Sequence, residues 1–442
     1  MNECFNKTKP ESLFKLGIIG AGYVGLPMAA VFASQGYEVS VAERDQSRFT
    51  MLSNAISPIA EPGLDELLTA GIESGKLRFF KSSKEAALNA DIIFLCVATP
   101  STPEGLADLS YVEAAAIEIA PVLKSGAIVV NKSTVPVGTA EQVRELLNRD
   151  DIFVVSNPEF FSEGNAVKES YHPERIVIGS DNLEAGNRVA SLFSISGAPI
   201  IHTDNRTAEL IKYTANAFLA TKLSFINAIA GLCEETGADV TDLVKAVGLD
   251  SRIGSKFLSP GPGWGGSCFP KDTLALAALA DEYNYSFPLL GEVVATNLEQ
   301  YDRIVNKVSR AVDTLPNSTI AVWGLTFKAG TNDRRDSPSL KIINRLMALG
   351  ANVVAYDPSV SVSDPGSDLD GISLCDNKYD ATKEADVLVI LTEWPEFASP
   401  DFELLKNSMY SRVIVDARNM LDVKESIDAG FTYEGIGNSA VS

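Results

Sequence analysis

The sequence predicts an α/β protein in which two doubly wound, parallel α/β domains are joined by a long central helix and a helical middle domain. Short apolar runs alternate with helical patterns at both ends of the chain, and residues 207–235 form one long helical pattern without proline. The chain has 442 residues, of which 45% are hydrophobic and only 21% charged, so it has enough apolar side chains for large cores. Both end domains are therefore expected to be Rossmann-like.

The first domain is expected to cover residues 1–205. A helix over residues 24–35 follows the first strand, and strand and helix then alternate as in a parallel sheet. The strands are expected at short apolar runs, namely residues 15–20, 37–42, 91–97, 127–131, 153–156 and 175–179.

A helical connector is expected over residues 206–312 and a second Rossmann-like domain over 313–442. Two stretches of the halves are alike, QGYEVSVAERD and LGANVVAYDP, and either gene duplication or the regularity of α/β units accounts for this. Two such halves flanking a connector would create a cleft. The expected connector helices span residues 207–235, 240–247, 274–283 and 292–312, and the later strands span 319–324, 352–356, 385–391 and 412–416.

Charge and composition exclude several classes of protein. The net charge of −21 argues against duplex nucleic acid and anionic membranes as partners. Five widely spaced cysteines and two histidines, without CxxC or HxxxH spacing, indicate free thiols and no metal site. The uncharged segment 16–37 is rich in glycine and contains Pro27, which favours a strand, turn and helix over a membrane span or signal peptide. We expect a cytoplasmic protein.

The motif Gly20-Ala-Gly22-Tyr-Val-Gly25 fits GxGxxG between a strand and a helix, and Glu43 ends the next strand. This context predicts a dinucleotide site in which the pyrophosphate binds at the helix N-terminus and Glu43 accepts hydrogen bonds from the ribose hydroxyls. An acidic residue there favours NAD over NADP. The neighbouring Arg44 and Arg48 weaken this inference, because arginines attract the 2′-phosphate of NADP. The alternative is a glycine-rich packing turn.

Cys268 follows a glycine-rich loop and precedes a helix that Pro270 is suited to start. A helix N-terminus and the nearby Lys271 both favour a thiolate, so Cys268 is a candidate nucleophile. The alternative is a small buried cysteine that only fills space.

Three further clusters are weaker signals. Glu159 and Glu163 are four residues apart, as are Lys212 and Asn216 on the long helical pattern. The loop 327–338 holds three cations, Lys328, Arg334 and Arg335, where an α/β crevice binds phosphates. For the glutamates the alternative is simple exposure to solvent. For Lys212 it is a side chain lying along the surface, and for the loop it is a solvated charged loop.

Together these motifs resemble the UDP-glucose 6-dehydrogenase family, within the wider nucleotide-sugar dehydrogenases. The resemblance covers nearly the whole chain, in the order GAGYVGLP, KSTVPVGT, NPEFFSEG, RIVIG, AELIKYTANAFLATKLSFIN, SRIGSKFLSPGPGWGGSCFPKD, GLTFKAGTNDRRDSPS and AYDP. It implies oxidation of a sugar C6 alcohol through an aldehyde to a carboxylate, with two NAD and one water consumed. The Cys268 thiolate would hold the intermediate as a thiohemiacetal and then as a thioester.

The resemblance also implies roles for individual residues. Catalytic roles fall on Cys268, Lys212, Asn216, Asp272, Glu159 and Thr134. Cofactor contacts fall on Gly20, Gly22, Tyr23, Val24, Gly25, Glu43, Arg48, Thr99, Thr134, Glu163, Lys271 and Arg335. Nucleotide-sugar contacts fall on Glu159, Phe160, Phe161, Ser162, Glu163, Lys212, Asn216, Arg252, Phe257, Leu258, Ser259, Gly263, Trp264, Gly265, Lys328 and Arg418.

Some positions depart from the family pattern, namely Ala98, Ser162, Trp264 and Ala329. UDP-glucose is the expected substrate, and GDP-mannose or another UDP-hexose is the alternative. The family residue matching Arg252 reaches across a dimer interface, which implies a homodimer or higher oligomer. Two other classes of protein are alternatives. One is a two-electron dehydrogenase resembling 6-phosphogluconate dehydrogenase, and the other is an NAD-sensing protein with Cys268 as a redox switch.

Overall fold

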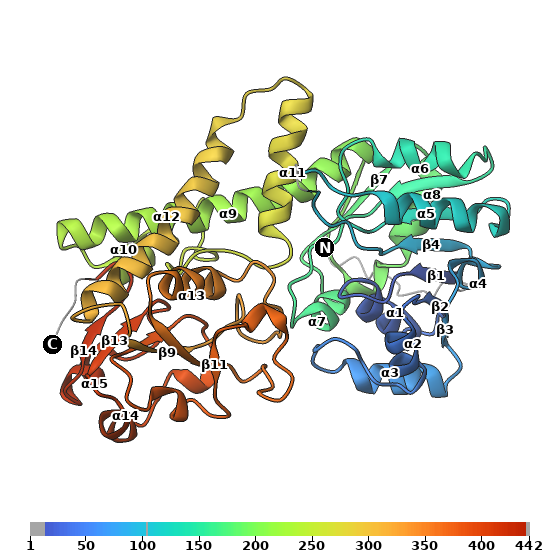
Figure 1. Ribbon diagram of the computed structural model, residues 1–442. Helices are drawn as coiled ribbons and strands as arrows, with labels where there is room; N and C mark the ends of the chain where they lie inside the picture. The colour runs from blue at the N-terminus through green and yellow to red at the C-terminus, as the bar shows by residue number, and fades with distance from the viewer. Residues whose placement is uncertain (1–13, 103–104, 439–442) are drawn as a thin grey trace, which may run out of the picture. The chain divides into compact units, whose positions relative to one another are not determined.

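The computed structural model describes residues 14–102 and 105–438, which fold into two compact units (Figure 1). Unit 1 covers Met1–Ala215 and unit 2 covers Asn216–Ser442. The boundary falls inside the longest helix, α9 (Asn205–Thr236), which is continuous across it. The three domains expected from the sequence, with boundaries at residues 205 and 312, stay a prediction.

Unit 1 contains an eight-stranded sheet in the order β3-β2-β1-β4-β5-β6-β7-β8. Neighbouring strands are parallel except β6 and β7. The carboxyl ends of β1, β4, β5 and β6 therefore meet at one edge, where sheets of this type bind ligands. The strands are β1 (Lys15–Ile19), β2 (Glu38–Ala42), β3 (Leu77–Phe80), β4 (Ile92–Leu95), β5 (Ile128–Asn131), β6 (Phe153–Ser156), β7 (Ile176–Ser180) and β8 (Ile200–Thr203).

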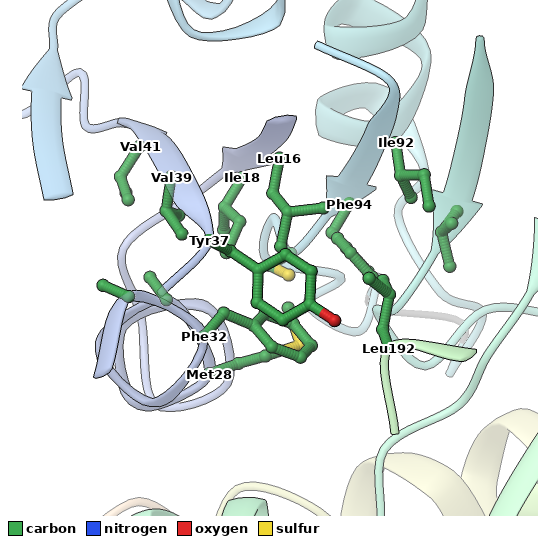
Figure 2. Close-up of a cluster of buried hydrophobic side chains, with 14 of the residues drawn as sticks. Leu16, Ile18, Met28, Phe32, Tyr37, Val39, Val41, Ile92, Phe94 and Leu192 are labelled. Atoms are coloured by element: carbon green, nitrogen blue, oxygen red, sulfur yellow. The ribbon is translucent and has the colours of Figure 1, made fainter. Parts of the chain in front are cut away.

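Helices cover both faces of this sheet, which is what makes the unit doubly wound. One core packs α1, α3 and α8 against the strands and includes Phe32, Tyr37 and Phe94, whose rings lie together in Figure 2. The other core packs α4, α5 and α6 against the opposite face. Because β4 and β5 are buried on both faces, they are short apolar runs, apart from Asn131 at the end of β5. The helices are α1 (Gly25–Ser34), α2 (Gln46–Ser53), α3 (Leu64–Glu73), α4 (Ser83–Ala87), α5 (Ser110–Ile119), η1 (Ala120–Val122), α6 (Thr139–Leu147), α7 (Ala166–Tyr171), α8 (Leu183–Ser191) and η2 (Ser194–Ser196).

The turn between β1 and α1 requires glycine at two positions. Gly20 has φ +106°, and a Cβ there would lie 2.5 Å from the Cys96 carbonyl oxygen. A Cβ on Gly25 would lie 2.1 Å from the Gly20 oxygen, so α1 packs directly on the turn. These two contacts explain the first and last glycines of the motif without any ligand.

Unit 2 contains a six-stranded parallel sheet in the order β11-β10-β9-β12-β13-β14. One face packs against α9, α10, α12 and α13, and the other packs against α14 and the short helix η5. The strands are β9 (Thr319–Trp323), β10 (Asn352–Tyr356), β11 (Ser373–Leu374), β12 (Val387–Ile390), β13 (Val413–Asp416) and β14 (Thr432–Glu434). The helices are α10 (Val240–Gly248), α11 (Phe269–Glu282), α12 (Pro288–Ala311), α13 (Pro338–Ala348), η3 (Ser367–Leu369), η4 (Asp380–Thr382), η5 (Pro395–Phe397), α14 (Phe402–Ser408) and α15 (Val423–Asp428).

Within the described ranges, α9 is the one helix that is long and apolar enough to cross a membrane by length and composition. A core helix of a soluble protein passes the same test. Glu209 and Lys212 of α9 are buried, and both are bonded to protein groups of unit 1. Such partners are typical of a core helix.

The predicted fold class is confirmed, with a parallel sheet and flanking helices in each unit. The strands that sequence patterns missed lie at sheet edges and carry mixed side chains; His202 lies on β8, for example. The helix expected from residue 274 begins at Phe269, because Cys268 is its N-cap residue and Pro270 occupies its first turn. Cys96, Cys233, Cys268 and Cys375 are free thiols, and Cys4 lies outside the described residues.

Candidate active site

The β1–α1 turn leaves room for a ligand at its middle glycine. A Cβ added to Gly22 would meet no atom within 4 Å, in contrast to Gly20 and Gly25. Val24 is the N-cap residue of α1 and makes no side-chain capping bond. The first-turn N–H groups of α1 therefore have no side-chain acceptor at the cap, so they suit an anionic group such as a pyrophosphate.

Glu43 follows β2 and lies beside this turn. Its Oε2 accepts a bond from Arg48 Nε at 3.2 Å, and Arg48 Nη2 donates to the Ala21 carbonyl oxygen at 2.7 Å. Arg44 is paired with Glu118. Both arginines that could attract a 2′-phosphate therefore already have carboxylate partners, and the local charge favours a ribose with free hydroxyls.

Thr99 and Thr134 join the loops that follow β4 and β5. The Thr99 hydroxyl donates to the Thr134 carbonyl oxygen at 2.9 Å, and Thr99 is buried. Both residues thus lie at the carboxyl edge of the unit 1 sheet, as the sequence predicts for a cofactor site.

A buried ion pair lies at the same edge. Lys212 Nζ is 3.0 Å from Glu159 Oε1, and their side chains are 4% and 7% exposed. The other carboxylate oxygen of Glu159 accepts the Phe161 N–H at 2.6 Å. Burial raises the pKa of Glu159, but the charge and hydrogen bond of Lys212, the Phe161 N–H and the charge of Lys132 together outweigh burial, so the pKa lies below its ordinary value. Glu159 is therefore a carboxylate at neutral pH.

The phenyl rings that follow Glu159 are contacted by cations. Arg175 lies 3.8 Å from the ring centroid of Phe160, and Lys212 Nζ lies 5.5 Å from it. The backbone N–H of Ser162 donates to Glu169 at 2.6 Å. The segment that begins at Glu159 is thus held by side chains of other elements.

Sequence analysis missed several buried polar residues of unit 1 that hold these loops. Glu61 accepts the N–H groups of Gly164 and Ala166, at 2.6 and 3.0 Å. Glu209 accepts from Gly138, Ala140 and Ser156, and burial raises its pKa to about 7. Lys132 and Asn157 bond to each other. One usable signal was a polar residue at the end of a buried strand or directly after it, as with Asn131, Lys132 and Asn157.

Unit 2 holds the second group of predicted catalytic residues. Cys268 is the N-cap residue of α11, with its Sγ 3.5 Å from the Ser267 hydroxyl oxygen. Asp272, one turn later, is fully buried and accepts a bond from Asn216 Nδ2 at 2.5 Å. Lys271 Nζ lies 2.5 Å from the other oxygen of Asp272. The structure thus brings Asn216, Lys271 and Asp272 together beside the first turn of α11.

The loop before Cys268 is held by side chains of α9 and α12. Asn297 accepts the Trp264 N–H at 2.8 Å and donates to the Trp264 carbonyl oxygen at 2.9 Å. Trp264 Nε1 donates to Ser224 at 2.9 Å, and Asn227 accepts the Gly261 N–H. These protein contacts preorganise the loop.

The predicted nucleotide-sugar residues of unit 2 fall into two groups. Arg418 donates to the carbonyl oxygens of Leu391 and Phe327, which fixes its guanidinium beside the loop that carries Lys328. Arg335, which is instead a predicted cofactor contact, is paired with Asp333 at 2.7 Å. The second group lies on the chain between α10 and α11. Arg252 is 87% exposed and bonded to Asp250, and Phe257 has φ +61°. Leu258 is buried, Ser259 is exposed, and Gly263 and Gly265 flank Trp264.

The acidic residue after β10 has different hydrogen-bond partners from Glu43. Asp357 follows the second strand of unit 2, as Glu43 follows that of unit 1. Its oxygens accept bonds from the N–H groups of Leu325 and Thr326, from Ser359 and from Trp394 Nε1. A carboxylate with this many donors has no acceptor site left for a ribose, so this half does not repeat the dinucleotide site.

Across residues 14–102 and 105–438, no group of three or more His, Cys, Asp or Glu side chains is arranged to hold a metal ion. The chemically active side chains are lysines and carboxylates in both units, and an amide and a thiol in unit 2.

Comparison with known families matches three successive segments of the chain. Residues 14–196 match the NAD binding domain, 206–299 the central domain and 321–423 the UDP binding domain of the UDP-glucose/GDP-mannose dehydrogenase family. The resemblance stated from the motifs is confirmed.

Individual relatives agree with this match over nearly their whole length. The chain is 44% identical to a UDP-glucose 6-dehydrogenase of Rhizobium meliloti, covering 96% of this chain and 99% of the relative. It is 43% identical to one of Bacillus subtilis, covering 97% and 94%. A solved UDP-glucose dehydrogenase from Pyrobaculum islandicum is 33% identical, with a TM-score of 0.90 over 98% of this chain and 99% of that one.

The geometry around Glu43 predicts a preference for NAD over NADP of at least about tenfold in kcat/KM, because a carboxylate repels a 2′-phosphate. Glu43→Gln keeps the shape and removes the charge, so the preference should narrow by about tenfold, or about 1.4 kcal/mol. Steady-state kinetics with both cofactors measure this. Glu38→Gln, at the exposed first position of β2, the strand that Glu43 follows, is the matched control and should leave the ratio unchanged. A wild-type preference for NADP would contradict the assignment.

Proposed function

The chain belongs to the UDP-glucose/GDP-mannose dehydrogenase family, and from that membership we propose that it oxidises UDP-glucose at C6 to UDP-glucuronate with two NAD⁺. The structural observation that best supports this is the buried Lys212–Glu159 pair at the carboxyl edge of the NAD binding unit. The net reaction converts UDP-glucose, two NAD⁺ and one water into UDP-glucuronate, two NADH and three protons.

NAD fits the β1–α1 turn, because the space at Gly22 is open and the first turn of α1 lacks a side-chain cap. When bound, NAD supplies a hydride acceptor for each of the two oxidations. Gly20, Gly22 and Gly25 would admit the pyrophosphate, and Glu43 would accept the ribose hydroxyls. Tyr23, Val24, Arg48, Thr99, Glu163, Lys271 and Arg335 complete the proposed cofactor contacts.

In the first oxidation the C6 carbon loses a hydride and its hydroxyl loses a proton. Lys212 assists this proton transfer or stabilises the negative charge that develops on oxygen. Asn216 helps to position the oxygen, and Asp272 supports the lysine or a water. The product of this step is an aldehyde.

Cys268 then holds the intermediate. Its thiolate adds to the aldehyde carbon, a C–S bond forms, and protonation of the oxygen gives a thiohemiacetal. Loss of a second hydride and a proton from this adduct gives a thioester. Its place as the N-cap residue of α11 supports this role, because a helix N-terminus stabilises a thiolate.

Hydrolysis completes the reaction. Glu159, with Thr134, takes a proton from water as the water attacks the thioester carbon, and the C–S bond breaks to release the acid and the Cys268 thiolate. The carboxylate form that this requires is the form favoured by the neighbouring Lys212. General-base assistance of this kind is typically worth about 10²–10⁴-fold.

The match of residues 321–423 to a UDP binding domain supports a nucleotide-sugar substrate. Lys328 and Arg418 of this region are the proposed cations for the nucleotide-sugar. The remaining proposed sugar contacts are Phe257, Leu258, Ser259, Gly263, Trp264 and Gly265 of unit 2, and Glu159, Phe160, Phe161, Ser162 and Glu163 of unit 1.

We also propose a cytoplasmic homodimer whose domains divide at residues 205 and 312. Phe218, Phe225 and Leu232 repeat every seven residues on α9 and are 64%, 58% and 57% exposed. Such a row of large apolar side chains is suited to contact a second copy. Arg252, 87% exposed, is available to a partner. Light scattering should give the mass of two chains or more, and a monomer at micromolar concentration would contradict the proposal.

The product stoichiometry tests the reaction class. With UDP-glucose, the protein should form two NADH for each UDP-glucuronate, because both oxidations occur before release. Absorbance of NADH together with chromatography of the nucleotide sugars measures this. One NADH per substrate would indicate a two-electron dehydrogenase. Faster turnover of GDP-mannose or another UDP-hexose than of UDP-glucose would show that the proposed substrate is wrong.

Replacing Glu159 with Gln should separate oxidation from hydrolysis. Gln keeps the shape and hydrogen-bonding capacity but removes the base, so both hydride transfers should proceed until Cys268 is acylated. Rapid-quench measurements should show a burst approaching two NADH per site, then slow turnover.

Mass spectrometry should detect a sugar adduct on Cys268 in this variant. The control is the double variant with Cys268→Ser, in which no thioester forms. Loss of the first hydride transfer without an adduct would place Glu159 earlier in the mechanism and contradict its assignment as the base for hydrolysis.

A further inference from the structure

Lys132 is a buried cation to which neither the motifs nor the proposed reaction gives a role. It directly follows β5, and its backbone N–H donates to the Leu95 carbonyl oxygen at 3.0 Å. The residue is only 4% exposed. A lysine buried to this extent is uncommon unless its charge is compensated.

The contacts of Lys132 converge on the segment that carries Glu159. Its Nζ donates to Asn157 Oδ1 at 3.1 Å and lies 5.6 Å from the ring centroid of Phe161 and 5.6 Å from that of Phe193. Asn157 and Phe161 flank Glu159 at two residues on either side. One ammonium group therefore holds both ends of the five-residue segment, through a charge-assisted hydrogen bond and a cation–π contact.

The anchored end of the segment is itself rigid. Asn157 Nδ2 donates to the Val177 carbonyl oxygen of β7 at 2.8 Å, and the Asn157 N–H donates to the Asn131 carbonyl oxygen at 2.9 Å. At the other end, the Phe161 N–H donates to Glu159 itself. A shift of Asn157 or Phe161 would therefore move the carboxylate.

Three buried charged groups interact in this region. Lys132 and Lys212 are two buried cations that interact with one buried carboxylate, Glu159, and with each other. Cys96 adds no negative charge to them at neutral pH, because burial raises the pKa of its thiol to about 12. The protonation state of Lys132 therefore changes the net charge around Glu159.

We infer that Lys132 is a positioning residue for the hydrolytic step, which fixes the Asn157–Phe161 segment and sets the geometry and basicity of Glu159. This inference rests on the proposed four-electron reaction. It assigns Lys132 no contact with substrate or cofactor, since it acts through Glu159.

A pH effect accompanies this role. Burial lowers the pKa of Lys132 to about 8, although the charge of Glu159 opposes the change and that of Lys212 adds to it. Among the described residues, Glu159, Lys212 and the neutral thiol of Cys96 are the titratable groups that face Lys132. As the pH rises through about 8, Lys132 loses its proton, and Glu159 then becomes a stronger base because one neighbouring positive charge is gone.

The test compares Lys132→Met, which keeps length and removes the charge and the donor, with Lys132→Arg, which keeps the charge. Lys84→Met, at an exposed position of the same unit, is the matched control. In Lys132→Met, acyl hydrolysis should slow by about 10- to 100-fold, the cost expected when a catalytic group is displaced by about 1 Å. A burst of two NADH and an adduct on Cys268 should appear, Lys132→Arg should recover part of the rate, and Lys84→Met should match the wild type.

Two readouts separate this role from a merely structural one. The pH–rate profile of hydrolysis should lose its ionisation near pH 8 in Lys132→Met. The double variant Lys132→Met/Glu159→Gln should be no more than about twofold slower than Glu159→Gln alone, because residues that act through one group are not additive. Multiplicative losses, an unchanged pH profile or loss of the first hydride transfer would each overturn the inference.

Folding of each variant is checked by thermal unfolding and by NAD affinity. If Lys132→Met does not fold, Phe193→Leu removes one aromatic face and keeps the lysine, and hydrolysis should slow by about three- to tenfold; an unchanged hydrolysis rate would overturn the inference. A wild-type protein that forms fewer than two NADH per UDP-glucose overturns both proposals. A wild type that forms two NADH, with Lys132→Met indistinguishable from it, overturns the inference alone.

Discussion

A carboxylate that is buried must be compensated, and the polar architecture of unit 1 follows from this constraint at Glu159. Moving an isolated carboxylate into a protein interior is costly, and the group protonates unless cations and N–H donors surround it. Lys212 and the Phe161 N–H supply that compensation directly, and Lys132 contributes further positive charge. Removing one partner from such a pair typically costs about 3–5 kcal/mol, so the cluster constrains the fold as well as the chemistry.

The same constraint accounts for the other buried polar residues at this edge of the sheet. Parallel strands end together, so the loops after β4, β5 and β6 bring many backbone N–H groups to one place. Glu61 and Glu209 each accept two or more of these donors from loops distant in sequence. The loops that carry Thr134 and Glu159 are therefore held in place by buried acids, which preorganises them for chemistry.

The two units show how one α/β pattern serves different purposes. Both place a glycine with φ near +100° after their first strand, at Gly20 and Gly324, and both have an acid after their second strand. In unit 1 that acid, Glu43, has one arginine partner beside an open turn. In unit 2 the acid, Asp357, is buried and saturated with donors. The local pattern is the same, and the difference lies in which neighbours fill the space.

The sequence by itself determined the fold class, the long helix and the places of Gly20–Gly25, Glu43, Cys268 and Lys212, because these depend on local spacing and on apolar periodicity. Tertiary structure alone decided that Lys212 pairs with Glu159, that Asn216 bonds to Asp272, and that Lys132 joins Asn157 to Phe161. Lys132 and Asn157 are 25 residues apart along the chain, and Asn216 and Asp272 are 56 apart. Spacing along a chain carries no information about such contacts, since they arise only when separate strands and helices pack together.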